Sequence, residues 1–252
     1  MRVLDLFCGE GGASKGYSDA GFSVVGVDNE PRCISRYMTT TDKHVGSPAY
    51  LGDWQTGLTY WLSRVQVDLI HASPPCQKYS QSARLHPEID YPDLIEPVRQ
   101  VLKDTGIHYV IENVPEAPLI DPVYLCGSMF QLYAPWKGEI VGLDRRRGFE
   151  TSFPVIAPLD CFCGDNRNVP VFGHGCPGNK SRSWLKGKGF SSLTQQLMQI
   201  DWMTRDGLTE AIPPVYSEYI GFSFQISTGQ MVNIKNRSQK ARHHQDKDVH
   251  FV

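Results

Sequence analysis

Short apolar runs alternate along the first half of the chain with segments whose spacing of apolar residues favours helices. Apolar runs cover residues 3–7, 22–27, 67–72 and 109–111. The segments with helical spacing between these runs are 13–20, 32–38, 58–65 and 94–104, and two more follow in the second half of the chain at 192–202 and 213–220. Strands that alternate with helices pair in parallel through crossover connections. The pattern therefore predicts an α/β fold built on a mostly parallel sheet.

The periodicity is lost in three places. A polar stretch from Lys78 to Pro92 is predicted to be a loop over a site. From about 151 to 192 no period is visible, and between 161 and 190 five Lys or Arg residues accompany a single acid, Asp165. The end of the chain is rich in cations, which favours a solvated tail, with a nucleic-acid contact as the alternative. We thus predict a main domain at 1–150 and 193–228, a small basic module at 151–192 and a flexible tail at 229–252.

Composition narrows the class of protein. The chain has 252 residues, 40% of them hydrophobic, which suffices for one sizeable domain with a small module. Its longest apolar runs fall far short of the roughly 20 residues that span a bilayer, so no membrane partner is expected. Met1 leads directly into the first predicted strand, and the seven cysteines follow no regular spacing, so a cytoplasmic protein with reduced thiols is expected. The net charge of −2 excludes a globally basic coat but allows a local basic face.

A glycine cluster and two acids indicate a nucleotide-like ligand. Gly9, Gly11 and Gly12 directly follow the first strand, where glycine lets the backbone approach a ligand and the next helix offers its positive end. Asp28, at the end of the second strand, is placed to take the hydroxyls of a ribose, and Asp53 to accept from an adenine amino group. The alternative is structural, because tight turns need glycine and favour aspartate. NAD and S-adenosylmethionine both fit this pattern.

Thiol, carboxyl and guanidinium groups follow in later segments. Cys76 comes after a buried strand and two prolines, which would present it in a cleft, and an inert buried thiol is the alternative. Glu112 ends the next strand. A strand through Arg145 and Arg147 would put both on one face, able to hold an anion or a base carbonyl, with an exposed basic edge as the alternative. The thiol and the carboxyl group are expected to converge.

The order of these motifs resembles that of the cytosine-5 DNA methyltransferases. The matching segments are Asp5 to Gly12, Asp28, Gly52-Asp53, Pro74 to Gln77, Glu112 to Val114 and Arg145 to Arg147. The resemblance covers roughly 1–150 and returns at about 192–221, and the gap corresponds to that family's variable target-recognition region. The compact size is similar to that of phage-encoded members. The resemblance implies a doubly wound, Rossmann-like, S-adenosylmethionine-dependent methyltransferase fold with a small irregular target-recognition module.

The resemblance also implies a reaction, a cofactor and a partner. The enzyme would transfer a methyl group from S-adenosyl-L-methionine to carbon 5 of a cytosine in double-stranded DNA and release S-adenosyl-L-homocysteine. A monomer in the cytoplasm of a bacterial or phage-infected cell is expected. The implied cofactor contacts are Phe7, Gly9, Gly11, Gly12, Asp28, Asp53 and Pro75. The implied DNA contacts are Gln77, Ser80, Lys180 and Arg182, and the implied catalytic residues are Cys76, Glu112, Arg145 and Arg147.

The implied mechanism is covalent. Carbon 5 of cytosine is a poor nucleophile, so Cys76 would add to carbon 6 and leave an enamine that accepts the methyl group. Glu112 would hydrogen-bond N3 and the exocyclic amine, which needs a protonated or proton-sharing carboxyl and hence a raised pKa. Arg147, with Arg145, would hold the carbonyl oxygen at carbon 2. The target base would be flipped out of the duplex, and the loop after Cys76 would close over it.

The chain departs from the family pattern in two motifs. Glu210 and Ala211 stand where the family usually has Asn followed by Ser or Ala. Leu143 replaces the usual Gln of the arginine motif.

Several hypotheses remain open at the level of sequence. The module at 151–192 holds four possible zinc ligands with an uncommon spacing, and small buried thiols are the alternative. These residues are Cys161, Cys163, His174 and Cys176. The alternative functions are methylation of transfer RNA, transfer of a modified one-carbon group to DNA, an inactive DNA-binding protein and a Rossmann oxidoreductase. The last of these leaves the Pro-Pro-Cys-Gln and Glu-Asn-Val segments without a role.

Overall fold

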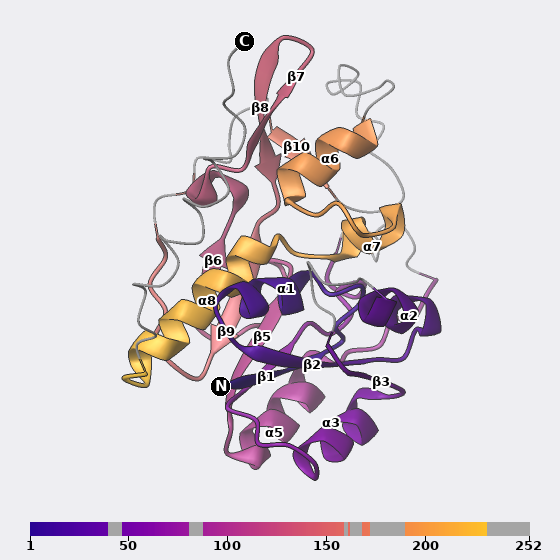
Figure 1. Ribbon diagram of the computed structural model, residues 1–252, viewed down its shortest axis with the longest axis vertical. Helices are drawn as coiled ribbons and strands as arrows, with labels where there is room; N and C mark the ends of the chain where they lie inside the picture. The colour runs from indigo at the N-terminus through magenta and orange to yellow at the C-terminus, as the bar shows by residue number, and fades with distance from the viewer. Residues whose placement is uncertain (40–46, 81–87, 159–160, 162–167, 172–189, 231–252) are drawn as a thin grey trace, which may run out of the picture.

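A seven-stranded mixed sheet forms the centre of the computed structural model, which describes residues 1–39, 47–80, 88–158, 161, 168–171 and 190–230 (Figure 1). Its strand order is β3-β2-β1-β4-β5-β9-β6. The strands are β1 (Arg2–Leu6), β2 (Ser23–Asp28), β3 (Ala49–Leu51), β4 (Leu69–Ala72), β5 (His108–Asn113), β6 (Val123–Leu125) and β9 (Arg147–Thr151). β1 to β5 pair in parallel, and β9 is antiparallel to both of its neighbours. The predicted α/β fold with a doubly wound sheet is confirmed.

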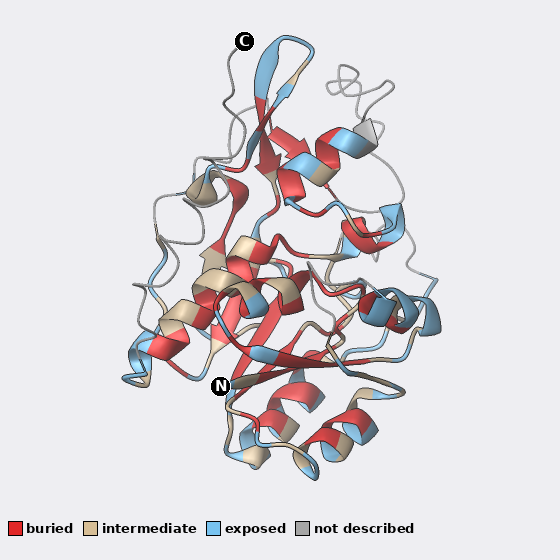
Figure 2. Ribbon diagram, in the orientation of Figure 1, coloured by how far each residue is buried: buried red, intermediate tan, exposed pale blue. Residues whose placement is uncertain are grey.

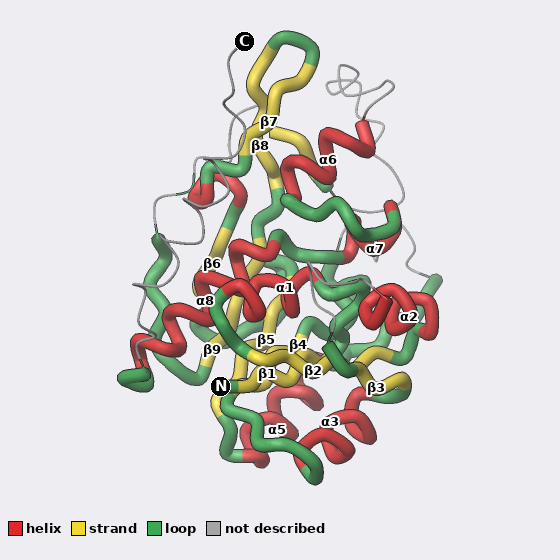
Figure 3. Tube along the Cα trace, viewed as in Figure 1, coloured by secondary structure: helices red, strands yellow, loops and turns green. Residues whose placement is uncertain are grey.

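Helices cover both faces of this sheet (Figures 1 and 3). α1 (Gly12–Asp19) and α8 (Pro214–Ser227) lie on one face, and α3 (Trp54–Leu62) and α5 (Ile95–Thr105) lie on the other, while α2 (Pro31–Thr39) packs near β3. Along β1, Val3 joins the apolar cluster on the α1 side, whereas Leu4 and Leu6 join the cluster on the α3 side. The central strands are therefore buried on both faces, as Figure 2 shows.

Three helices differ in extent from the sequence prediction. The helix predicted at 58–65 begins earlier, because the Asp53 side chain accepts a hydrogen bond from the Thr56 amide and caps α3. The helix predicted at 192–202 is α6 (Phe190–Met198), and the one predicted at 213–220 is α8, which continues to Ser227. None of the helices in the described ranges combines the length and apolar character needed to cross a membrane.

A second, three-stranded sheet stands beside the main one in the order β10-β8-β7. It pairs the hairpin β7 (Tyr133–Trp136) and β8 (Glu139–Asp144) with β10 (Asn168–Pro170), and α6 packs on it. η1 (Gly127–Phe130) leads into the hairpin, and α7 (Arg205–Glu210) follows α6. The sequence prediction assigned everything up to residue 150 to the main domain. The hairpin instead shares its sheet with a strand from the predicted small module, because β10 completes the open edge of β8.

α1 and α8 pack so closely that Gly16 has no room for a side chain. A β-carbon at Gly16 would lie 1.9 Å from the Pro214 carbonyl oxygen and 2.2 Å from the Ser217 hydroxyl oxygen. Gly16→Ala would gain about 0.5–1 kcal/mol of helix propensity, but overpacking against rigid backbone costs about 1–3 kcal/mol or more. We expect this variant to lower the free energy of unfolding measured by denaturant titration. Ser18→Ala, at an exposed position of the same helix, should change the free energy of unfolding by less than about 0.5 kcal/mol. A Gly16→Ala protein with the free energy of unfolding of the wild type would contradict the close packing.

Candidate active site

The turn between β1 and α1 has an unusual backbone. Gly9 has φ 53° and Gly11 has φ 94°, and Phe7 has φ 62° although it is not glycine. A positive φ at a bulky residue is a strained conformation that concentrates at functional sites. The turn that sequence analysis singled out is therefore shaped for more than a simple strand-to-helix connection.

Asp28 is fixed against this turn. The Gly9 amide donates to its Oδ2 at 2.8 Å, and the Glu30 amide donates to its Oδ1 at 2.9 Å. Asp53 lies at the end of the neighbouring strand β3, exposed, with its Oδ1 taken by the Thr56 amide. The Gly52 amide donates to the Asp28 carbonyl, so the two acids stand on adjacent strand ends. The structure thus brings together the two acids and the glycine turn.

Gly12 has a packing role in the same turn. A β-carbon there would lie 2.9 Å from the Ile212 carbonyl oxygen and 3.0 Å from the β-carbon of Ala211. Close approach between the start of α1 and the chain before α8 explains this glycine. The structural alternative raised for the glycines therefore accounts for Gly12, while the positive φ values of Gly9 and Gly11 define the turn itself.

Glu10 is a buried acid in the turn that sequence analysis passed over. Its carboxylate accepts hydrogen bonds from the amide and the hydroxyl group of Thr204, the residue that caps α7, and it lies 3.5 Å from Arg36 Nε. Trp202 donates to the Glu10 carbonyl oxygen. These contacts tie the chain before α8 to the glycine turn. An acid inside a glycine cluster was the signal available in the sequence.

Cys76 follows β4 at the same edge of the sheet. Asn113, at the end of β5, donates from its side chain to the Pro74 carbonyl oxygen at 2.9 Å, which holds the proline segment against the sheet. The amides of Tyr79 and Ser80 donate to the Cys76 carbonyl oxygen. The Cys76 thiol is half-buried. Cys76 thus lies beyond the end of β4, and the predicted cleft around it stays a prediction.

Glu112 and Arg147 form an ion pair beside Cys76. Arg147 Nε lies 3.2 Å from Glu112 Oε1, because the antiparallel β9 starts where β5 ends. Burial raises the pKa of the Glu112 carboxyl group, against the opposing effects of Arg147 and of a hydrogen bond from Ser73. Burial also raises the pKa of the Cys76 thiol; Arg147 opposes this shift and Glu112 adds to it. The thiol and the carboxyl group therefore share one electrostatic environment.

Arg145 is placed differently from the prediction. A strand through Arg145 and Arg147 is wrong, because β8 ends at Asp144 and β9 begins at Arg147. Arg145 is 2% exposed and donates to the carbonyl oxygens of Val171 and Thr209, and burial lowers its pKa to about 9. Its Nε has no hydrogen-bond partner in the described structure. Arg145 thus joins the segment after β10 to α7, while only Arg147 is paired with Glu112.

Only some of the remaining predicted residues lie within the part of the chain that the structure describes. Gln77 is exposed, and Ser80 donates from its hydroxyl group to the Gln77 carbonyl oxygen. Lys180 and Arg182 lie outside the described residues, as do three of the proposed zinc ligands, Cys163, His174 and Cys176. Cys161 is described and exposed, and its sulfur lies 2.9 Å from that of Cys126. Sequence spacing gave no sign of this neighbour, since the two cysteines are 35 positions apart.

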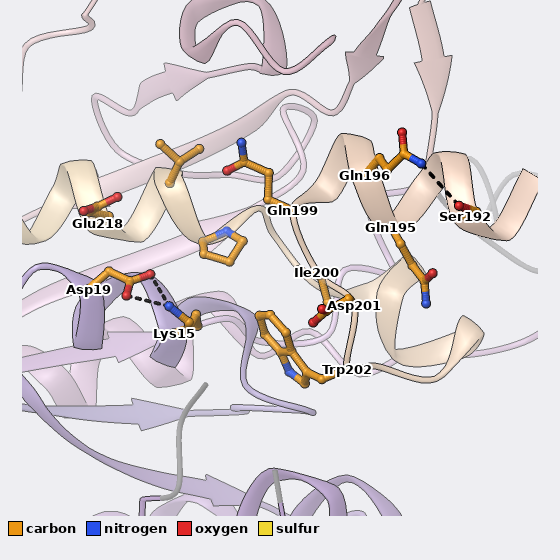
Figure 4. A pocket seen from close by; sticks show the side chains of 12 residues that line it. Lys15, Asp19, Ser192, Gln195, Gln196, Gln199, Ile200, Asp201, Trp202 and Glu218 are labelled. Atoms are coloured by element: carbon orange, nitrogen blue, oxygen red, sulfur yellow. Dashed lines mark hydrogen bonds and ion pairs between the residues drawn. The ribbon is translucent and has the colours of Figure 1, made fainter. Parts of the chain in front are cut away.

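A surface groove of about 510 Å³ lies elsewhere, between α1, α8 and the end of α6 (Figure 4). Its lining includes Trp202, several glutamine side chains and the ion pair between Lys15 and Asp19. None of the residues predicted for catalysis or cofactor binding lines it. The groove is separate from the cluster around Cys76.

Comparison with known proteins identifies the family. Residues 1–118 match the model of the C-5 cytosine-specific DNA methylases. The type II methyltransferase M.HgiGI of Herpetosiphon aurantiacus is 30% identical over 121 residues, which are 47% of this chain and 94% of that protein. A candidate type II methyltransferase of Methanocaldococcus jannaschii, M.MJ0563P, is 25% identical over 136 residues, 46% of this chain and 42% of that protein. The chain thus matches less than half the length of the latter relative.

The fold agrees with these matches. The Dnmt2 methyltransferase of S. pombe superimposes with a TM-score of 0.56 at 11% identity, over 91% of this chain and 99% of that one. This likeness confirms the expected Rossmann-like methyltransferase architecture. The family match includes the glycine turn, Asp28, Cys76 and Glu112. This chain belongs to the C-5 cytosine-specific DNA methylase family.

Proposed function

We propose that the protein transfers a methyl group from S-adenosyl-L-methionine to carbon 5 of a flipped-out cytosine in duplex DNA, through a covalent adduct with Cys76. The observation that carries this proposal is the convergence of three groups at one edge of the sheet. Cys76 follows β4, Glu112 lies near the end of β5, and Arg147 begins β9 with its guanidinium 3.2 Å from the Glu112 carboxylate.

Each group has a defined task in this reaction. The Cys76 thiolate forms a bond to carbon 6, and the ring electrons move toward N3, where the Glu112 carboxyl group shares its proton. Arg147 neutralises charge on the carbonyl oxygen at carbon 2. The resulting enamine would direct its electron pair from carbon 5 to the methyl group, and the bond from this group to the donor sulfur would break and release S-adenosyl-L-homocysteine. Loss of the carbon 5 proton to water then restores the double bond and expels Cys76.

The residues at the glycine turn fit the proposed methyl donor. The carboxylates of Asp28 and Asp53 stand on adjacent strand ends, and the Asp53 Oδ2 is not used by the helix cap. Asp28 would take the ribose hydroxyls, Asp53 the adenine amino group, and Phe7, Gly9, Gly11 and Pro75 would border the ligand. When bound, S-adenosyl-L-methionine supplies an electrophilic methyl group.

Asp28→Asn is expected to weaken binding of S-adenosyl-L-homocysteine by roughly tenfold to a hundredfold, because hydrogen bonds to a charged group contribute about 1.5–3 kcal/mol. Isothermal titration calorimetry measures the dissociation constant without turnover. Asp19→Asn, in which the lost carboxylate pairs with Lys15 on α1, should leave the constant unchanged. Equal affinity of the Asp28→Asn and wild-type proteins would remove Asp28 from the cofactor site.

DNA contacts are assigned to the small module and its neighbours. We propose that 151–192 recognises the target and that Gln77, Ser80, Lys180 and Arg182 contact DNA, by reading base edges or by gripping phosphate. The β7–β8 hairpin shares a sheet with β10 of this module, so it belongs to the same proposed recognition unit. The main domain then consists of the seven-stranded sheet and its helices.

Nucleoside mass spectrometry tests the proposal. Purified protein is incubated with S-adenosyl-L-methionine, or with a donor that carries a modified one-carbon group, and with either duplex DNA or transfer RNA, and the digested nucleosides are analysed. We expect 5-methylcytosine in DNA alone. Methylation of transfer RNA alone would mean that transfer RNA, and not DNA, is the substrate. A different mass added to cytosine from the modified donor would mean that the transferred group is not methyl. No modified nucleoside in any arm, despite measured cofactor binding, would refute the activity.

A further inference from the structure

A row of buried polar side chains crosses the central strands under α1. Asp5 on β1 pairs in register with His71 on β4, and Glu112 lies on the next strand, β5. Asp5 and His71 are fully buried and Glu112 is 6% exposed. Strands buried on both faces are normally apolar, so these three polar residues need partners. The partners of His71 and Glu112 form a connected set of hydrogen bonds, whereas Asp5 accepts a separate hydrogen bond from Ser14.

His71 is bonded through both ring nitrogens. Its Nδ1 lies 2.9 Å from the Tyr17 hydroxyl oxygen on α1, and its Nε2 lies 2.8 Å from the Ser73 hydroxyl oxygen. Burial lowers the pKa of His71 to about 3, so the ring is neutral near pH 7 and has one donor and one acceptor. Each nitrogen therefore has a single role.

The hydrogen bond from Ser73 to Glu112 fixes the direction of the others. The Ser73 hydrogen bond favours the charged form of Glu112, and a carboxylate in that form only accepts, so Ser73 donates its one proton to the ionised Glu112. Ser73 must then accept from His71, which puts the ring proton on Nε2. Nδ1 in turn accepts from the Tyr17 hydroxyl. All three hydrogen bonds point the same way, toward the Glu112 carboxyl group.

We propose that Tyr17, His71 and Ser73 form a buried hydrogen-bond relay that positions the Glu112 carboxyl group for its contact with the target base. Arg147 holds Glu112 at Oε1, and Ser73 provides a second fixed contact. Two contacts set the orientation of a planar group, whereas one leaves it free to rotate. The three residues act through Glu112 and are positioning residues. This inference rests on the proposed role of Glu112 in methyl transfer.

The relay also acts on the charge of Glu112. Since the Ser73 hydrogen bond favours the charged carboxylate, its loss raises the Glu112 pKa further. The protonated carboxyl group then persists to higher pH, and the alkaline limb of kcat/KM that reports its loss moves upward. The other groups that interact electrostatically with Glu112 are Asp5, Tyr17, Cys76, Arg145 and Arg147. All of them remain in place in a Ser73 variant.

Ser73→Ala is therefore expected to lower kcat by roughly tenfold or more, to leave the KM for S-adenosyl-L-methionine unchanged and to shift the alkaline limb to higher pH. Ser73→Thr, which keeps the hydroxyl group, should recover most of kcat and the wild-type limb. His71→Leu should resemble Ser73→Ala, and Tyr17→Phe, which removes only the last hydroxyl, should have a smaller effect.

Ser217→Ala is the matched control. This variant also removes a fully buried hydroxyl group next to α1. The Ser217 hydroxyl group donates to the Ala13 carbonyl oxygen and is not part of the relay. Its pH profile should equal that of the wild type. An unchanged kcat in Ser73→Ala would overturn the relay. A loss of kcat that is not accompanied by a pH shift, and that Ser73→Thr does not recover, would also overturn it.

A nuclear magnetic resonance measurement tests the relay without turnover. In protein labelled with ¹⁵N-histidine, we expect the His71 ring proton on Nε2 and no titration between about pH 5 and about pH 8. A proton on Nδ1, or titration in this range, would refute the relay. If the wild-type protein methylates no substrate, the proposed function fails, while this measurement still decides the hydrogen-bond chain.

Discussion

Cys76→Ala is expected to abolish methyl transfer, with a loss of activity on the order of 10⁴-fold or more, because removing a covalent nucleophile leaves carbon 5 of cytosine unactivated. The side chain lies just beyond β4, where Asn113 holds the preceding prolines against β5. Alanine keeps this backbone and removes only the sulfur. Mass spectrometry of methylated nucleosides measures the loss, and calorimetry with S-adenosyl-L-homocysteine should show unchanged binding.

A second measurement isolates the covalent step. In duplex DNA containing 5-fluorocytosine, methyl transfer leaves fluorine in place of the proton that must leave, so the adduct at carbon 6 cannot break down. The wild-type protein should form a complex that survives denaturing electrophoresis, and Cys76→Ala should not. Cys33→Ala, which removes another half-buried thiol, should form the complex normally. Residual methylation above about one per cent in Cys76→Ala would refute the covalent role.

Local patterns predicted the elements that carry the candidate site. Each of β1, β2, β4 and β5 is an apolar run followed by glycine, acid or proline, so the motif residues fall at strand ends where the sheet brings them together. The predicted convergence of Cys76 and Glu112 followed from this topology. A sequence pattern can specify where a strand ends, because the end of a strand depends on a few adjacent residues.

Long-range contacts were beyond the reach of the same patterns. The β7–β8 hairpin was not among the predicted strands, and nothing local indicates that β8 pairs with β10 rather than with the main sheet. The sequence pattern predicted Arg145 on one strand face with Arg147, but its guanidinium group donates to backbone carbonyl oxygens of two distant segments. His71 reads as part of an apolar strand, and only the positions of Tyr17 and Ser73 show why a polar ring is tolerated there. These residues depend on partners that local sequence does not reveal.

Glu112→Gln is expected to lower kcat by roughly 10²- to 10⁴-fold while changing the KM for DNA little. Glutamine keeps the length of the side chain, and its amide can still donate to N3 and accept from the exocyclic amine, so binding of the base persists. It cannot deliver a proton as negative charge develops on N3. Steady-state kinetics on duplex DNA separates the two parameters, and exposed Glu116→Gln in the following loop serves as the control.

The same variant should make Cys76 more reactive toward a simple electrophile. The charge of Glu112 raises the Cys76 pKa and that of Arg147 lowers it, so removing the carboxylate lowers the pKa and increases the thiolate fraction at a given pH. Alkylation of Cys76 by iodoacetamide, followed by mass spectrometry of the peptide, should therefore be faster in Glu112→Gln than in the wild type although methylation is slower. Faster alkylation of Cys76 together with slower methylation would assign Glu112 to proton transfer at the base. Parallel losses of alkylation and methylation would instead mean that Glu112 serves to maintain the nucleophile.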